Sequence, residues 1–122
     1  MTLIESLPDI TIEKPYIIIE GRSIPADADL FYLGEYGLYN KIKYALETWN
    51  KVIIEFKFKY YNTISQRYLT SIMLLFDKFS SYVDLTVNWY YESAGRDTDY
   101  DMKEYGEEYQ ELINTKINIL KR

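Results

Sequence analysis

The segment 52–79 constrains the fold more than any other part of the chain, because a strand pattern passes directly into a helix pattern. Its first half alternates apolar and charged residues, the period of two expected of a β-strand with one covered face. Its second half repeats apolar residues at the spacing of one helical face. The apolar positions are Ile54, Phe56, Phe58 and Tyr60 in the strand, and Leu69, Ile72, Met73, Phe76 and Phe79 in the helix. A strand and a helix must therefore lie back to back, joined at Asn62-Thr63-Ile64-Ser65.

Hydroxyl groups stand at this predicted junction. Thr63, with Gln66 three residues later, fits a capping box in which the hydroxyl accepts a backbone N–H and the amide reaches back. A helix N-terminus also carries unpaired N–H groups that favour negative charge. A phosphate on Thr63, or alternatively on Ser65, would change the surface there without unfolding the core. The junction therefore predicts a phosphorylation switch.

The rest of the chain predicts one α/β domain spanning residues 1–122. Each later strand follows a helix long enough to bring parallel neighbours together, whereas the first two strands are close enough to pair antiparallel. We expect a mixed central sheet of four to five strands packed with about three helices in an α/β sandwich. The remaining segments are strands at Asp9–Glu13, Pro15–Glu20, Leu85–Tyr91 and Lys116–Leu120, helices from Leu38 and at Asp101–Asn114, a loop at Gly21–Pro25, and a turn with a short helical piece at Pro25–Gly37.

Composition closes most catalytic routes. The chain has no cysteine and no histidine, so it lacks a thiolate nucleophile and the commonest general base and metal ligand. A net charge of −5 argues against nucleic acid or an anionic membrane as partner. No glycine-rich phosphate loop or membrane-spanning run is present. We expect a cytoplasmic, non-enzymatic protein without cofactor or metal, whose partners are proteins.

Two features leave other functions open. Fourteen tyrosines could form an aromatic platform, although half-buried positions explain most of them. Carboxylates between Asp97 and Glu111 could serve a hydrolase, and four fall at calcium-loop spacing, but Met102 replaces the glycine that such a loop needs. A carboxylate-based hydrolase or sugar-binding module is the alternative from a different functional class.

Several blocks in the order found here resemble the SiaC family of bacterial regulatory phosphoproteins. The resemblance covers residues from about Glu13 to Leu112 and includes Thr63 as the match to the family's phosphorylated threonine. At Ile64 this chain departs from the serine that the family commonly has. The blocks are Gly21–Pro25 with Phe31-Tyr32, Tyr60–Ser65, Asn88–Glu92 and Asp99–Glu107.

The resemblance implies a fold like that of the STAS domains, the anti-sigma factor antagonists. It also implies a protein kinase and a phosphatase that act on Thr63, and an effector such as a diguanylate cyclase, bound by the unphosphorylated form in cyclic di-GMP and biofilm control. We expect the effector surface to comprise Asn62, Thr63, Ile64, Ser65 and Arg67. An anti-sigma factor antagonist in a partner-switching system is the second reading.

Overall fold

The computed structural model describes residues 6–92 and 97–122, and it confirms the expected mixed α/β class. The short helical piece expected before residue 37 is a separate helix, so the described part contains four helices and five strands. The elements are β1 (Asp9–Glu13), β2 (Tyr16–Ser23), α1 (Ala28–Leu33), α2 (Leu38–Thr48), β3 (Lys51–Tyr61), α3 (Thr63–Phe79), β4 (Asp84–Tyr91), α4 (Asp97–Leu112) and β5 (Ile117–Lys121).

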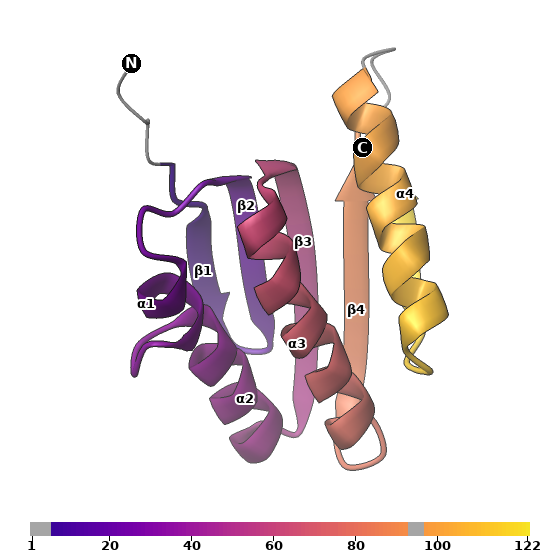
Figure 1. Cartoon of the computed structure of the whole chain (residues 1–122). Coiled ribbons are helices and arrows are strands. Elements are labelled where there is room, and N and C mark those ends of the chain that lie inside the picture. The colour runs from indigo at the N-terminus through magenta and orange to yellow at the C-terminus, as the bar shows by residue number, and fades with distance from the viewer. Residues whose placement is uncertain (1–5, 93–96) are drawn as a thin grey trace.

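The strands lie in the sheet in chain order, β1-β2-β3-β4-β5. β1 and β2 are antiparallel across a tight turn with a cis Lys14-Pro15 bond, whereas each later pair is parallel. Right-handed crossovers that always step in the same direction put every helix on the same side of a sheet. Figure 1 shows this arrangement, with all four helices in front of the strands. The expected sandwich therefore has two layers.

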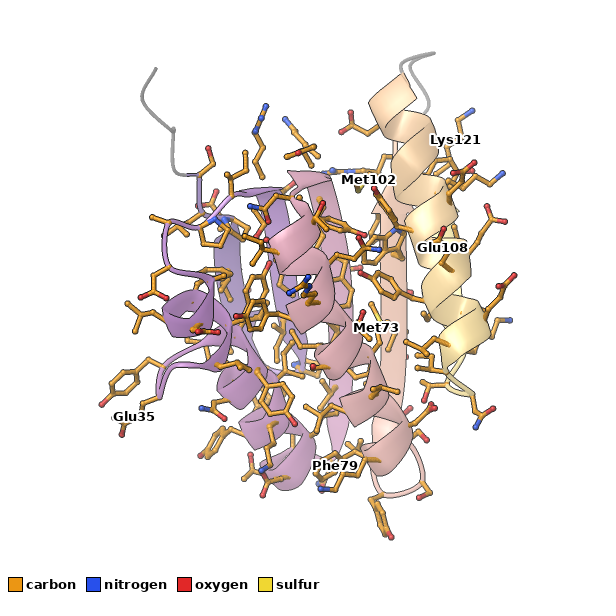
Figure 2. All side chains as sticks on the ribbon, viewed as in Figure 1. Glu35, Met73, Phe79, Met102, Glu108 and Lys121 are labelled. Atoms are coloured by element: carbon orange, nitrogen blue, oxygen red, sulfur yellow. The ribbon has the colours of Figure 1, made fainter. Side chains whose placement is uncertain are left out.

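The core lies between the helices and the covered face of the sheet. Trp89 of β4 is fully buried at its centre, with its ring 5.4 Å from that of Phe56 and 5.4 Å from that of Tyr109 of α4. Its Nε1 donates to the carbonyl of Met102 at 2.6 Å, which fixes α4 against β4. Figure 2 shows Met73 of α3 between α3 and α4.

The alternation of β3 changes phase near its end. Gly21 of β2 pairs with Phe58, but Arg22 pairs with Tyr60, so Lys59 is an extra residue in β3. Such a bulge turns the following side chains to the opposite faces. Tyr61 is consequently buried and Tyr60 is 38% exposed. The assignment of Tyr60 to the covered face was wrong for this reason.

Two predicted boundaries were also wrong. β2 continues through the expected loop at Gly21–Pro25 as far as Ser23, because Arg22 and Ser23 still pair with β3 beyond the glycine, whose φ is 115°. α4 begins at Asp97 rather than Asp101. Since most of its apolar residues follow position 101, the pattern gave no sign of the first turn.

The face of the sheet away from the helices carries a polar network. Glu55 of β3 accepts hydrogen bonds from the Tyr90 hydroxyl at 2.8 Å and from Nδ2 of Asn88 at 3.3 Å. Asn118 of β5 donates to Oδ1 of Asn88 at 3.0 Å, and Arg122 reaches Glu20 of β2 at 2.6 Å. These groups satisfy one another where water meets the sheet, so this face does not need a further layer.

We expect Asp77→Ala to lower the free energy of unfolding by about 1–2 kcal/mol at neutral pH. Asp77 of α3 holds the α4–β5 connection by accepting from the Thr115 hydroxyl at 2.6 Å, the Thr115 amide at 2.7 Å and the Asn114 amide at 2.9 Å. Desolvation raises the pKa of Asp77, but these hydrogen bonds outweigh it and lower the pKa overall.

A lowered pKa in the folded state means that this stabilisation is present above the carboxyl's unfolded pKa and disappears as pH falls through the folded value. Urea unfolding of wild type and Asp77→Ala should therefore differ at pH 7 and converge in acid. Ser71→Ala, an exposed change on the same helix, serves as the control and should be near neutral at both pH values. An Asp77→Ala difference that persists undiminished in acid would contradict this role.

Candidate functional site

The candidate site lies where β3 ends and α3 begins. Asn62, not Thr63, is the N-cap of α3: its Oδ1 accepts the Ser65 amide at 2.9 Å. Asn62 also accepts the first backbone hydrogen bond of the helix, because its carbonyl oxygen accepts the Gln66 amide at 3.2 Å. The predicted capping box of Thr63 and Gln66 was wrong by one residue, because asparagine and threonine are both good caps and stand next to each other.

The side chains of the junction separate into an exposed group and a buried one. Thr63, Ile64 and Arg67 are exposed, with Ile64 at 53% of its full area, while Asn62 is half-buried. Ser65, the alternative acceptor, is completely buried. The five residues of the predicted surface therefore lie at one place in the fold, but Ser65 supports it from below.

Ser65 belongs to a buried hydroxyl network that the sequence did not reveal. Its Oγ lies 3.0 Å from Oγ of Ser23 at the end of β2 and donates to the Ser23 carbonyl at 3.2 Å. Oγ of Ser23 in turn lies 2.6 Å from the hydroxyl of Tyr32 in α1. The same Ser23 carbonyl accepts the Asn62 amide at 3.2 Å. The network ties β2, α1 and the first turn of α3 together directly beneath Thr63.

A second layer of contacts fixes α1 against α3. The ring of Tyr32 stacks on that of Tyr68, with centroids 5.1 Å apart, and the Tyr68 hydroxyl donates to the Asp29 carboxylate. Burial raises the pKa of Tyr32, against the opposing hydrogen bonds from Ser23 and Ser65. Tyr32 thus stays a neutral phenol, and the hydroxyl network that joins it to Ser23 and Ser65 carries no charge.

We expect Asn62→Ala to lower the free energy of unfolding by about 1 kcal/mol, because the Ser65 amide loses its acceptor. Gln66→Ala should be near neutral, since Asn62 rather than a capping box supplies the cap. Urea unfolding monitored by circular dichroism measures both. A larger loss in Gln66→Ala than in Asn62→Ala would restore the capping box and contradict the cap seen here.

Two hollows beside β1 and α2 lack the paired carboxylates of a carboxylate-based hydrolase. Each hollow contains one carboxylate, Glu35, whereas such an enzyme needs two across a cleft. The buried phenol Tyr109, whose pKa burial raises to about 12, holds its proton at neutral pH and cannot act as a base there. Among the described side chains, those of residues 6–92 and 102–122, no three metal-ligating groups gather in one place, and the calcium-loop positions Asp97, Asp99 and Asp101 lie outside them.

No helix in the described part of the chain is both long and apolar enough to cross a bilayer.

Comparisons with known proteins place the chain in a family. The chain is similar to SiaC of Pseudomonas aeruginosa at a TM-score of 0.79 and 16% identity, covering 100% of this chain and 96% of that one. Apo-SiaC from the same organism gives a TM-score of 0.76 at 18% identity, with 98% and 95% covered.

A third similar structure is that of the diguanylate cyclase SiaD in complex with its activator SiaC from Pseudomonas aeruginosa, at a TM-score of 0.74 and 16% identity, with 98% and 95% of the two chains covered. At these identities the structures establish a shared fold. A comparison with curated protein sequences yields no match. The sequence profile described as SiaC family regulatory phosphoprotein matches residues 5–122, nearly the whole chain, and the chain therefore belongs to the SiaC family.

Proposed function

We propose that this chain is a non-enzymatic switch that is phosphorylated on Thr63 and binds a protein effector when Thr63 is unmodified. The observation that carries the proposal is the contrast within one helical turn. Thr63 is exposed at the first position of α3, while Ser65 is buried and hydrogen-bonded to Ser23. A kinase can reach the first hydroxyl and not the second.

The surroundings of Thr63 suit a phosphate. The N-terminal end of a 17-residue helix carries partial positive charge, and Arg67 follows Thr63 by one turn on the exposed side. A phosphate would add about −1.5 to −2 charges where the helix dipole and a guanidinium both favour them. The modified protein would stay folded, and its change would be confined to the surface.

The same surface is suited to an effector. Ile64 exposes an apolar side chain next to Thr63, the cation Arg67 follows one turn later, and the Ser65–Ser23 contact ties this first turn of α3 to β2. We infer that a diguanylate cyclase is the effector, with Asn62, Thr63, Ile64 and Arg67 in the contact and Ser65 supporting it. The fold of this chain is similar to that of SiaC in its complex with the cyclase SiaD, and this similarity favours a cyclase over an anti-sigma factor as the effector. A cytoplasmic kinase and phosphatase would set the state.

Phosphate mapping on chain purified from its native host tests the proposal. Intact mass should show one phosphate, and fragmentation should place it on Thr63. Thr63→Ala should abolish it, whereas Ser65→Ala should retain it, provided that circular dichroism shows both variants folded. Phosphate found on Ser65, or on any residue outside the junction, would refute the assignment.

A further inference from the structure

The outer edge of β1 is a second candidate for recognition. β1 pairs with β2 on one side, and no strand within residues 6–92 and 97–122 pairs with its other side. Its five residues, Asp9–Glu13, contain no lysine, no proline and no bulge, and their pairing with β2 is continuous from Asp9 to Glu13. Proteins commonly protect sheet edges with such devices, because the unpaired N–H and C=O groups of an edge invite another strand.

Two hollows lie beside this edge on the helix side of the sheet. Ile10 lines one of about 430 Å³, and Ile12 lines another of about 470 Å³. Both are bordered by Glu35, Tyr36 and Lys41 from the α1–α2 region. Figure 2 shows Glu35 at this outer margin of the molecule.

The spacing of the hollows matches an extended chain. Ile10 and Ile12 are two residues apart on one strand, and alternate side chains of a strand repeat about every 7 Å. A strand added to β1 would therefore place one apolar side chain in each hollow. Main-chain hydrogen bonds supply affinity and pockets for alternate side chains supply specificity in this mode of recognition.

The opposite face of β1 selects the charge of the added strand. Asp9 and Glu13 are exposed at its two ends, with Thr11 between them. If a second copy paired antiparallel about Thr11, Asp9 of each copy would oppose Glu13 of the other, which places like charges together twice. Glu35 and Lys41, which border both hollows, bring one negative and one positive charge, so they add no net charge to the site. The Lys14 ammonium lies over the Trp49 ring, 5.9 Å from its centroid. Basic residues opposite Asp9 and Glu13 would pair favourably.

We propose that β1 and the two hollows form a docking site for an extended segment of a partner protein, with alternating apolar side chains bordered by lysine or arginine. This site lies on the first strand of the sheet, away from the β3–α3 junction, and goes beyond the Thr63 switch. Its failure would leave that switch untouched.

Peptide selection tests the proposal directly. A random phage-displayed library is panned against the immobilised full chain and against Asp9→Lys/Glu13→Lys, two changes at exposed positions. We expect the wild type to enrich alternating apolar peptides with basic borders, and the double variant to enrich acidic borders. A resynthesised wild-type peptide should bind the double variant about tenfold more weakly. No enrichment, or equal binding to both chains, would overturn the proposal.

Three further measurements locate the binding. Tyr44 lines the second hollow, so Tyr44→Ala should weaken peptide binding. Tyr82 is 83% exposed and lies outside both hollows, so Tyr82→Ala should leave peptide binding unchanged. Peptide binding should slow amide exchange in β1, and Thr63→Ala should bind the peptide as wild type does. Protection confined to other elements would overturn the site, and a dimer that the Asp9→Lys/Glu13→Lys change dissociates would assign the edge to a second copy instead.

Discussion

Gly106→Ala should lower the free energy of unfolding by up to about 3 kcal/mol, although alanine is the better helix former by about 1 kcal/mol. A Cβ atom at position 106 of α4 would lie 2.6 Å from Cδ1 and 2.9 Å from Nε1 of Trp89. Real Cβ atoms do not approach so closely. Either the indole of Trp89 or helix α4 has to move. Whether Gly106→Ala lowers or raises the free energy of unfolding therefore tests how firmly α4 and Trp89 are held against each other.

The surroundings of Trp89 leave it little room to yield. The side chain is fully buried, its Nε1 donates to the Met102 carbonyl, and the rings of Phe56 and Tyr109 pack on it. A shift of the indole would break these contacts, so we expect α4 to be displaced from the sheet. Because Trp49 is the second tryptophan of the chain, a Trp49→Phe background makes fluorescence report on the buried Trp89, and so on that displacement.

Urea unfolding measures the change in stability, and Glu107→Ala is the matched control. Glu107 is the exposed neighbour of Gly106, so its replacement by alanine tests helix propensity without touching Trp89. The control should fall within about 0.5 kcal/mol of wild type. If Gly106→Ala were as stable as wild type or more so, the close approach of α4 to Trp89 would not be a constraint.

Phosphorylation of Thr63 should weaken the effector complex by at least tenfold, equivalent to about 1.4 kcal/mol. The proposed contact includes the exposed Ile64, whose neighbour would gain about −1.5 to −2 charges. Burying that charge against apolar surface carries a desolvation cost, and an acidic partner surface would add repulsion. Calorimetric titration of a candidate diguanylate cyclase with modified and unmodified chain measures the difference.

Two charge variants separate this local effect from a change in net charge. Thr63→Asp places one negative charge at the first residue of α3, and Ser80→Asp places one at its far end, about 25 Å away along the helix. Thr63→Asp should weaken binding less than phosphate does, and Ser80→Asp should leave it unchanged. Equal weakening by both variants would count against a contact centred on Thr63.

The two periods in segment 52–79 were sufficient to predict β3 and α3, because burial of one face follows directly from residue spacing. They failed at Tyr60, where the extra residue Lys59 reverses the faces, since a bulge depends on the pairing with β2. The placement of Thr63 at the start of the helix was predicted to within one residue. The local sequence pattern could not show whether Asn62 or Thr63 accepts the Ser65 amide.

The support beneath the site was beyond prediction for a different reason. Ser23 and Ser65 are 42 positions apart and meet only once β2 has paired with β3. Short polar side chains carry no periodicity that marks them as buried, so Ser65 resembled a surface acceptor. Ser23 ends one strand and Ser65 stands four residues after the end of the next, a spacing that indicates a contact only once the two strands are known to pair in parallel.

The order of the strands has a consequence for synthesis. Because every strand lies beside the one that precedes it in the chain, each new helix and strand can dock onto structure already formed, without waiting for a distant partner. Chains grow on the ribosome at about 5–20 residues per second, slowly enough for such stepwise docking. Nascent chains that end after β4 and are followed by a spacer long enough to clear the ribosome should therefore already protect β2 and β3 from proteolysis, and the last helix and strand complete the layer in the full chain.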